Sequence, residues 1–323
     1  MPPSVVPASA SAPAKTILLG EHAVLYGHPA VALPFPPLQA QATLEPAEET
    51  TLVSERYPDL AARLTGEVPR PLVPLAEAVK GSLEAIARTG TPIQSFRLSV
   101  TSEIPAGAGL GSSAAVVVAA IRATFSFHGS TVSSSLLRHL ATQAEAVAHG
   151  ASSGLDPSTV ASEGPIRFVR DHAPVPLAIR EPFGLVVADT GEHVATRDMV
   201  ERVKARVAAY PQDEATLAHL GELAEELAER LEQADYNRVG ELLNLAHADL
   251  STLGLSTPKL DAVSAAARLE GAYGAKLSGG GGGGCVVAMV PLDRLKSVAD
   301  AMARSGASRV WPAQYLIQRE GTP

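Results

Sequence analysis

The chain has very few cysteine and tryptophan residues. Cys285 is its single cysteine, so no disulfide can form within the chain and no metal site can be built from several thiolates. This scarcity fits a reducing compartment, and we expect a cytoplasmic protein. We expect Cys285 to be an inert, buried residue at the start of a strand, and the single tryptophan, Trp311, to serve packing.

Positive charge and long apolar runs are also scarce. The formal net charge is −8, so the chain lacks the excess of Lys and Arg that neutralises a nucleic-acid backbone. Glycine, proline or charged residues interrupt every apolar run well before the roughly 20 residues that a membrane-spanning helix needs. We therefore expect neither nucleic acid nor a membrane as a partner. A length of 323 residues, of which 46% are hydrophobic, is sufficient for two packed domains.

Apolar periodicity predicts an α+β protein. We place a domain boundary near Gly164, which gives an N-terminal domain over residues 1–164 and a C-terminal domain over residues 165–323. The predicted strands are Lys15–Leu19, Pro29–Leu33, Phe96–Val100, Ile166–Val169, Gly184–Asp189, Tyr273–Leu277, Cys285–Val290 and short strands near Val310 and Tyr315. The predicted helices are Leu75–Ala87, Ser112–Phe127, Ser133–His149, Thr196–Tyr210, Glu214–Gln233, Asp235–Leu250, Thr257–Glu270 and Leu292–Arg304.

Two segments show no sustained period. Met1–Ala12 is small and rich in proline, and we interpret it as a loose arm. Leu44–Pro74 is rich in Glu, Pro, Arg and Thr, which is typical of an irregular loop. Because long loops often lie near functional sites, we expect this loop to be a mobile lid.

A glycine loop comes directly before a predicted helix. Gly107, Gly109 and Gly111 allow a polyphosphate to approach the main chain, and the helix start offers unpaired N–H groups. Ser112 and Ser113 add hydroxyls that could hold a phosphate oxygen or Mg²⁺. An ordinary turn with a serine N-cap explains the same residues equally well.

Two common nucleotide-binding patterns are excluded. A P-loop has lysine directly before its Ser or Thr, but Gly111 stands there. A Rossmann fingerprint has an acidic residue about 20 positions later, and Ala119–Ser130 contains no Asp or Glu.

Several polar residues each have a structural explanation as well as a functional one. Lys15 could extend along the surface to solvent, and Glu21 with His22 could cap a turn. Glu145 could be an exposed helix charge. Asp156, ahead of Pro157, and Thr196 could be helix N-caps. The glycine run from Gly279 to Gly284 could be a flexible linker, although its apolar flanks favour tight packing around a nucleotide and the first glycine loop. The histidines, His193 among them, show no metal-binding spacing.

Three stretches, taken together, resemble the motifs of the GHMP kinase superfamily, most closely in the form found in mevalonate kinases. They are Ala12–Lys15 with Gly20–Val24, then Pro105–Ser113, then Lys276–Cys285. Their order and separation are similar to those of the family, so the resemblance covers nearly the whole chain. It implies an α+β, two-domain GHMP kinase fold, with an N-terminal domain like ribosomal protein S5 domain 2 and a helix-rich, ferredoxin-like C-terminal domain.

The resemblance also implies roles for individual residues. ATP and Mg²⁺ would be the cofactors and mevalonate the substrate, phosphorylated at its primary hydroxyl, with Asp156 and Lys15 catalytic and Ser113 and Glu145 holding Mg²⁺. The phosphate-binding residues would be Pro105, Ala106, Gly107, Ala108, Gly109, Leu110, Gly111, Ser112 and Ser113. The substrate-site residues would be Lys15, Glu21, His22, Asp156, Thr196, Gly279 and Gly280.

Rival functions stay open at the level of sequence. Phosphomevalonate kinase, a mevalonate 3-kinase and sugar kinases share the superfamily, and a non-catalytic nucleotide-binding protein is a further alternative. Two positions depart from the family pattern: Ser152 stands where proline is usual, and Gly280 where alanine is common. A homodimer is an expectation that no motif tests.

Overall fold

The computed structural model describes residues 7–149 and 153–316. The chain divides into two compact units, each built from separate segments. Unit 1 comprises Met1–Ala14, Leu38–Pro105 and Gly111–Ser162, and unit 2 comprises Lys15–Pro37, Ala106–Leu110 and Glu163–Pro323. A single domain boundary near Gly164 stays a prediction.

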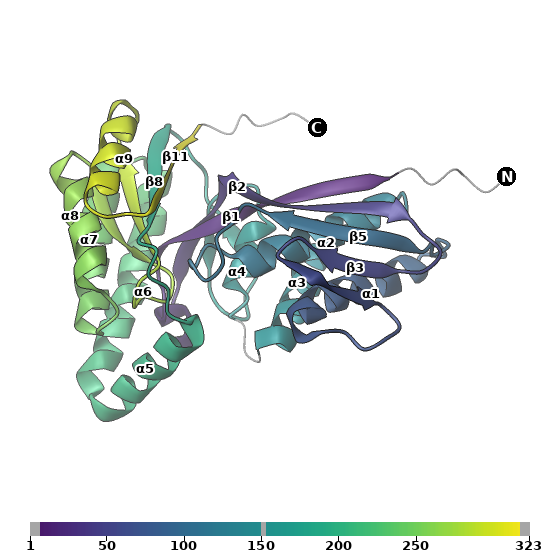
Figure 1. Cartoon of the computed structure of the whole chain (residues 1–323). Helices are drawn as coiled ribbons and strands as arrows, with labels where there is room; N and C mark the ends of the chain where they lie inside the picture. The colour runs from purple at the N-terminus through teal and green to yellow at the C-terminus, as the bar shows by residue number, and fades with distance from the viewer. Residues whose placement is uncertain (1–6, 150–152, 317–323) are drawn as a thin grey trace. The chain divides into compact units, whose positions relative to one another are not determined.

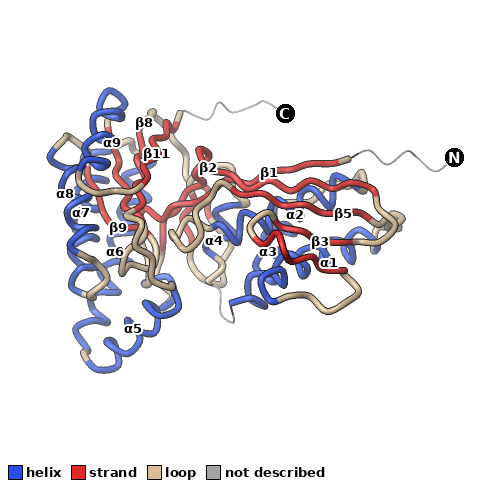
Figure 2. Tube along the Cα trace, in the orientation of Figure 1, coloured by secondary structure: helices blue, strands red, loops and turns tan. Residues whose placement is uncertain are grey.

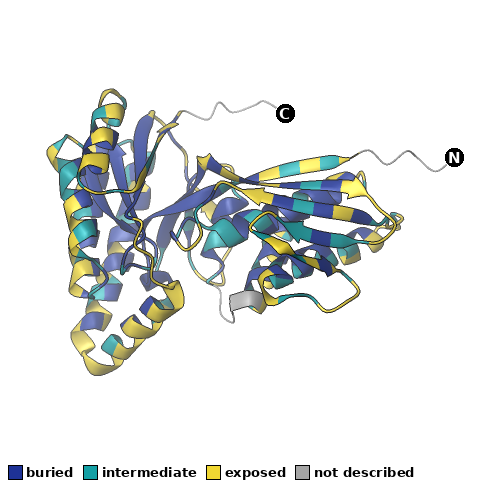
Figure 3. Ribbon diagram, viewed as in Figure 1, coloured by how far each residue is buried: buried dark blue, intermediate teal, exposed yellow. Residues whose placement is uncertain are grey.

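Unit 1 contains a sheet whose strands are partly buried. Strand β5 pairs antiparallel with β2 and parallel with β3, and β3 continues into an antiparallel pair with β4. Along β2 and β5 buried and exposed residues alternate, as the colours of Figure 3 show, so one face of the sheet packs and the other meets solvent. The strands are β2 (Ala30–Pro46), β3 (Thr51–Ser54), β4 (Tyr57–Arg63) and β5 (Phe96–Ser102).

Four helices complete unit 1. Helices α1, α2 and α3 pack on one another, and α2 contacts both β5 and α4 (Figure 1). Ala119 and Ala120 of α2 are fully buried, and such small side chains allow close packing of the neighbouring helices. The helices are α1 (Val73–Ala87), α2 (Ser112–Phe127), α3 (Ser134–His149) and α4 (Leu155–Val160), with a 3₁₀ turn η2 (Arg70–Leu72) before α1.

Unit 2 contains a four-stranded antiparallel sheet in the order β11-β8-β10-β9. The central strands β8 and β10 are buried along their whole length, which explains why they appear in the sequence as continuous apolar runs. Helices α7 and α8 pack against β9, and α9 against β8 and β11. The strands are β8 (Phe183–Asp189), β9 (Gly274–Ser278), β10 (Cys285–Val290) and β11 (Arg309–Tyr315).

The remaining elements of unit 2 complete its packing. Strand β6 pairs with the first residues of β2, and β7 pairs with β6. The helices are α5 (Thr196–Ala209), α6 (Pro211–Glu232), α7 (Tyr236–Thr252), α8 (Pro258–Leu269) and α9 (Leu295–Arg304). The short elements are η1 (Ala23–Tyr26), β6 (Ile166–Phe168), β7 (Val175–Pro176) and η3 (Leu292–Arg294). Within residues 7–149 and 153–316, no helix combines the length and apolar character needed to cross a bilayer.

Two sequence-based predictions about irregular segments are wrong. Strand β1 runs over Ala8–Leu19, so Ala8–Ala12 belong to a strand and not to a loose arm. Leu44–Pro74 contains the end of β2, the β3–β4 hairpin and η2, and Figure 2 shows β3 as a strand. Leu52 of β3 lies opposite Leu98 of β5, and both are fully buried. The strands are too short for their alternation to stand out among polar residues. The mobility of the segment stays a prediction.

Candidate active site

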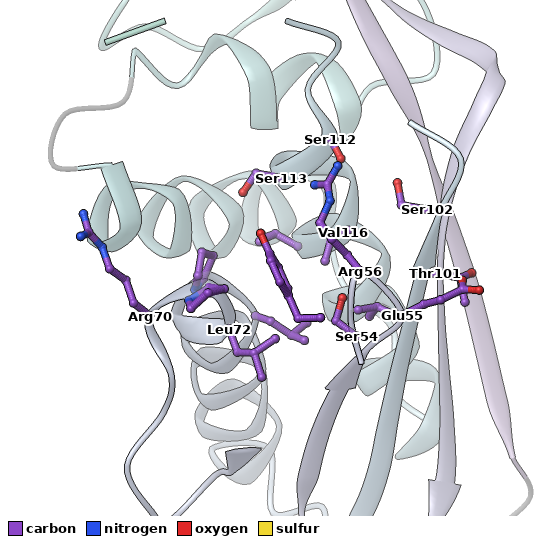
Figure 4. A pocket seen from close by; sticks show the side chains of 16 residues that line it. Ser54, Glu55, Arg56, Arg70, Leu72, Thr101, Ser102, Ser112, Ser113 and Val116 are labelled. Atoms are coloured by element: carbon purple, nitrogen blue, oxygen red, sulfur yellow. The ribbon is translucent and has the colours of Figure 1, made fainter. Parts of the chain in front are cut away.

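A cavity of unit 1 measures about 780 Å³, which is the size of a small-molecule site. The β3–β4 hairpin, the start of α1 and the first turns of α2 enclose it, with Ser112 and Ser113 at one end (Figure 4). Its wall combines apolar side chains with hydroxyls and charges, which suits a ligand that has both a ring and polar groups. The lining includes Ser54, Glu55, Arg56, Tyr57, Arg70, Leu72, Leu75, Thr101, Ser102, Val116 and Val117.

The two serines of the glycine loop are not helix N-caps. Gly111 is the N-cap of α2, in the left-handed conformation at φ 71°, where a side chain would be strained. Ser112 Oγ donates to the carbonyl of Ile104 at 3.4 Å, and Ser113 Oγ donates to Glu145 Oε1 at 2.5 Å. The N-cap interpretation therefore fails for both serines.

Ser113 and Glu145 have the chemistry that Mg²⁺ requires. A hydroxyl and a carboxylate oxygen are hard ligands, and Mg²⁺ is usually held by one or two such side chains together with phosphates and water. Glu145 is 7% exposed and so is not the exposed helix charge of the alternative interpretation. Among the described residues there is no group of three or more His, Cys, Asp or Glu residues that could hold a metal. The pair thus fits a metal that arrives with the nucleotide.

Asp156 lies in the first turn of α4 and is not an N-cap either. The N-cap is Gly154, at φ 80°, and Asp156 is half-buried. Because α4 packs against α2, Asp156 and the glycine-loop serines belong to one packed body. Lys15 belongs to unit 2, so the pairing of Lys15 with Asp156 stays a prediction.

Within unit 2, residues 106–110 of the glycine loop contact the C-terminal glycine run directly. The amide of Lys15 donates to the carbonyl of Leu110 at 3.0 Å, which holds the loop on β1. A Cβ added to Gly279 would lie 3.4 Å from Gly109 Cα, so backbone packs against backbone. Ala108 and Leu110 are buried, whereas Gly107 and Gly109 have positive φ angles of 73° and 77°.

The glycine run is an ordered structure, not a linker. The amide of Gly284 donates to Glu192 at 2.6 Å, and that of Gly282 donates to Leu255 at 2.7 Å. A Cβ on Gly283 would lie 2.2 Å from the carbonyl oxygen of Glu192. Glycine is therefore the one residue type that fits at this position without displacing backbone.

Lys15, Glu21 and His22 are all buried, with exposed fractions of 2%, 2% and 5%. A lysine that extended to solvent would be exposed, so the surface interpretation of Lys15 fails. Glu21 Oε1 forms an ion pair with Lys276, whose side chain is fully buried. Burial lowers the pKa of the Lys276 ammonium, and the charge of Glu21 opposes this shift.

His22 and Glu21 each present a polar atom without a hydrogen-bond partner. His22 Nε2 donates to the carbonyl of Gly280 at 2.9 Å, so Nδ1 of the neutral ring is an acceptor. Burial lowers the pKa of the His22 imidazole. Neither His22 Nδ1 nor Glu21 Oε2 has a partner among the described residues. Buried polar atoms are rarely left unsatisfied, so these two fit a ligand that donates hydrogen bonds.

Thr196 lies beside the glycine run. It is the first residue of α5, and Ala195 is the N-cap, so the N-cap interpretation of Thr196 fails. A Cβ on Gly280 would lie 3.3 Å from Thr196 Oγ1, so the alanine common in the family would press on this threonine. A cleft of about 10 Å³, enough for about one water, lies between Thr196 and the two glycine segments. It is lined by Gly107, Ala108, Gly109, Val194, Thr196, Ser278, Gly280, Gly281, Gly283 and Gly284. Ser152 lies outside the described residues.

Sequence reasoning missed several residues of the site. The motif gives Lys276 no role of its own, although a lysine inside an apolar strand signals a buried ion pair. Ser278 Oγ donates to the carbonyl of Ile17 at 3.0 Å and accepts from its amide, which joins β9 to β1. Tyr57 and Arg56 were hidden in the segment interpreted as a loop.

Two segments of the chain match sequence models of a known protein family. Residues 77–164 match the sequence model of the GHMP kinases N terminal domain, and residues 223–308 match that of the GHMP kinases C terminal domain. A mevalonate kinase of Thermococcus gammatolerans is 35% identical over 332 residues, covering 97% of this chain and 96% of the relative.

Two solved structures share the fold. The mevalonate kinase of Methanococcus jannaschii superimposes with a TM-score of 0.80 at 23% identity, covering 98% of this chain and 100% of that one. The L. major mevalonate kinase in complex with R-mevalonate superimposes with a TM-score of 0.77 at 23% identity, covering 96% of each chain.

Proposed function

Because the chain belongs to the GHMP kinase family, we propose that it transfers the γ-phosphoryl group of ATP to the primary hydroxyl of mevalonate, giving 5-phosphomevalonate and ADP. The observation that carries this proposal is the cavity of about 780 Å³ that ends at Ser112 and Ser113. The 35% identity to a mevalonate kinase over nearly the whole chain supports mevalonate as the acceptor.

The nucleotide is bound by groups of two kinds. Leu72, Val116 and Tyr57 offer an apolar wall for the adenosine part. Pro105–Ser113 and the first amides of α2 bind the phosphates, because a helix N-terminus presents unpaired N–H groups and a positive dipole end. The positive φ angles of the glycines leave the main chain open to the phosphate oxygens.

Ser113 and Glu145 would hold Mg²⁺. When bound, Mg²⁺ offsets the negative charge of the phosphates and of the transferring group. The hydrogen bond of 2.5 Å between the two side chains keeps their oxygens together before the metal arrives.

The acceptor is positioned by polar groups of the predicted substrate site. Asp156 orients the primary hydroxyl and accepts its proton, and Lys15 offsets the charge that develops on the oxygen. Glu21, His22 and Thr196, together with Gly279 and Gly280, bind the rest of the substrate. The unsatisfied acceptors of Glu21 and His22 support this, because mevalonate carries hydroxyl donors. A cytoplasmic location and a homodimer belong to the same proposal.

A coupled assay of ADP release tests this function. Purified protein is given ATP, Mg²⁺ and either mevalonate, phosphomevalonate or galactose. We expect turnover with mevalonate and none with phosphomevalonate or galactose. The phosphorus NMR signal of the product should be split by two adjacent protons, as a primary phosphate ester requires. An unsplit signal would identify the tertiary hydroxyl as the acceptor, and turnover with phosphomevalonate or galactose would identify a different kinase of the family.

A further inference from the structure

We propose that His193 binds the nucleotide's polyphosphate on the glycine loop, through its ring nitrogen Nδ1. This inference rests on the proposed function, because it names a further binding residue for the nucleotide of that reaction. His193 lies in the loop after β8, and no role was predicted for this residue from the sequence.

The orientation of the His193 ring is held by a buried carboxylate. His193 Nε2 donates to Asp189 Oδ1 at 2.8 Å, and the Asp189 side chain is only 4% exposed. The same oxygen accepts the amide of Gly191 at 2.9 Å. Ser308 donates from its amide to the carbonyl of Asp189 at 2.7 Å, which anchors the backbone as well. The ring is therefore preorganised, and Nε2 is committed to Asp189.

The other side of the ring faces the glycine loop. A Cβ added to Gly107 would lie 3.7 Å from His193 Cβ and 3.8 Å from His193 Nδ1. Nδ1 makes no hydrogen bond within the part of the chain that the structure describes. The side chain is 30% exposed, so a ligand lying on the loop can reach it.

A phosphate ligand would accept a hydrogen bond from the second ring nitrogen of His193. A histidine that donates from both nitrogens, to Asp189 and to a phosphate oxygen, is an imidazolium, and its bond to the phosphate is charge-assisted. Ala106–Leu110 contributes no charged side chain of its own. Glu192, the acidic neighbour of His193, is paired with Lys259 at 3.7 Å. His193 thus adds a side-chain donor where the loop offers only amides.

The chain contains a matched control. His219 forms an equally short pair with Asp249, at 2.8 Å between Nδ1 and Oδ2, and its side chain is 47% exposed. His219 lies on α6, and among the described residues its side chain has no hydrogen bond to the glycine loop. Comparing His193→Gln with His219→Gln therefore separates the loss of a cation at the loop from the loss of any exposed His–Asp pair.

Calorimetric titration of the full chain with Mg²⁺–ADP and with adenosine tests the inference. We expect His193→Gln to weaken Mg²⁺–ADP about fivefold to tenfold, the size of one charge-assisted hydrogen bond at a partly exposed site. Adenosine binding and the KM for mevalonate should stay unchanged, and the KM for ATP should rise by the same factor. His193→Arg should restore Mg²⁺–ADP binding to within about twofold, because it returns the positive charge. His219→Gln should behave as wild type.

Other outcomes would overturn the inference. Wild-type affinity of His193→Gln for Mg²⁺–ADP would show that the ring does not contact phosphate. An equal loss for ADP and adenosine, or no recovery in His193→Arg, would show that His193 only supports the loop. Because ADP binding does not depend on the acceptor, a protein that fails to phosphorylate mevalonate but shows the His193 effect would refute the proposed acceptor and leave this inference standing.

Discussion

The cavity of unit 1 and the cleft of unit 2 are built in opposite ways. The cavity, about 780 Å³ in volume, is walled by side chains such as Tyr57, Leu72 and Val116. The cleft, about 10 Å³ in volume, is walled mainly by glycine backbone. The cavity of unit 1 is therefore suited to select a ligand by the shape of its side chains. The cleft of unit 2 brings main-chain groups into contact and leaves no room for a side chain.

The two regions also treat charge differently. In unit 1, Glu145 is buried beside a hydroxyl, and Asp156 is half-buried in a helix first turn. In unit 2, Lys276 and Glu21 form a fully buried ion pair. Removing one partner of such a pair leaves an uncompensated charge, so the loss of either Glu21 or Lys276 should be poorly tolerated.

The largest effect on turnover is expected from substitution of Asp156 in unit 1. Asp156→Asn should reduce turnover about 100-fold or more, the scale of losing a general base, while Mg²⁺–ATP binding stays near wild type. Steady-state kinetics and calorimetry measure the two quantities.

Asp198→Asn is the matched control, because Asp198 lies in the first turn of α5. It removes the same charge from a helix start and should leave turnover unchanged. Near-normal turnover of Asp156→Asn would refute the catalytic assignment.

The next largest effect concerns the glycine packing of unit 2. Gly283→Ala should lower the free energy of unfolding by about 2 kcal/mol more than Gly27→Ala, the scale of overpacking. Both glycines have positive φ, but a Cβ on Gly27 meets nothing within 4 Å, whereas one on Gly283 meets the carbonyl of Glu192. Denaturant melts of the two variants measure the difference. Equal destabilisation would mean that backbone conformation, and not close contact, demands glycine there.

A smaller effect is expected in the side-chain wall of unit 1. Tyr57→Ala should raise the KM for ATP about fivefold, because the cavity loses an aromatic surface, and should leave the KM for mevalonate unchanged. Tyr210→Ala, which removes an exposed ring outside the cavity, should change neither value. A rise in both KM values for Tyr57→Ala would indicate a general distortion of unit 1 and not a nucleotide contact.

The smallest effect is a pH dependence carried by unit 2. Burial lowers the pKa of the His247 imidazole below 6.5, against the opposing charge of Asp261 and aided by Arg268 and Lys276. The unfolded chain therefore binds a proton that the folded chain does not, so stability falls as pH drops from about 6.5 towards the lowered pKa.

His247→Gln should make this fall shallower in urea melts between pH 7 and pH 5. The fall should not vanish, because burial lowers the pKa of His22 as well. A slope identical to wild type would exclude His247 as its source.

The helices and strands could largely be predicted from the sequence. Ser112–Phe127 was predicted as a helix and is α2, and Cys285–Val290 was predicted as a strand and is β10. Long apolar segments have a period that survives packing. The β3–β4 hairpin was missed because strands of four and seven residues, rich in polar residues, carry little period of their own.

The residues of the candidate site could be predicted from sequence motifs. The contacts between these residues could not. Glu21 pairs with Lys276, and His193 lies against Gly107, although the members of each pair are far apart in the chain. The burial of Lys15 likewise depends on the packing of distant segments. No local pattern encodes such contacts, because each depends on how segments from different parts of the chain fold together.

By itself, the sequence determined the order of most helices and strands, the two glycine segments and the family to which the chain belongs, because these depend on local residue types and their spacing. The tertiary structure alone decided which polar groups are buried, which glycines have no space for a side chain and which histidine faces the loop. Burial and close approach are properties of packed segments, and packing is settled only when the whole chain is folded.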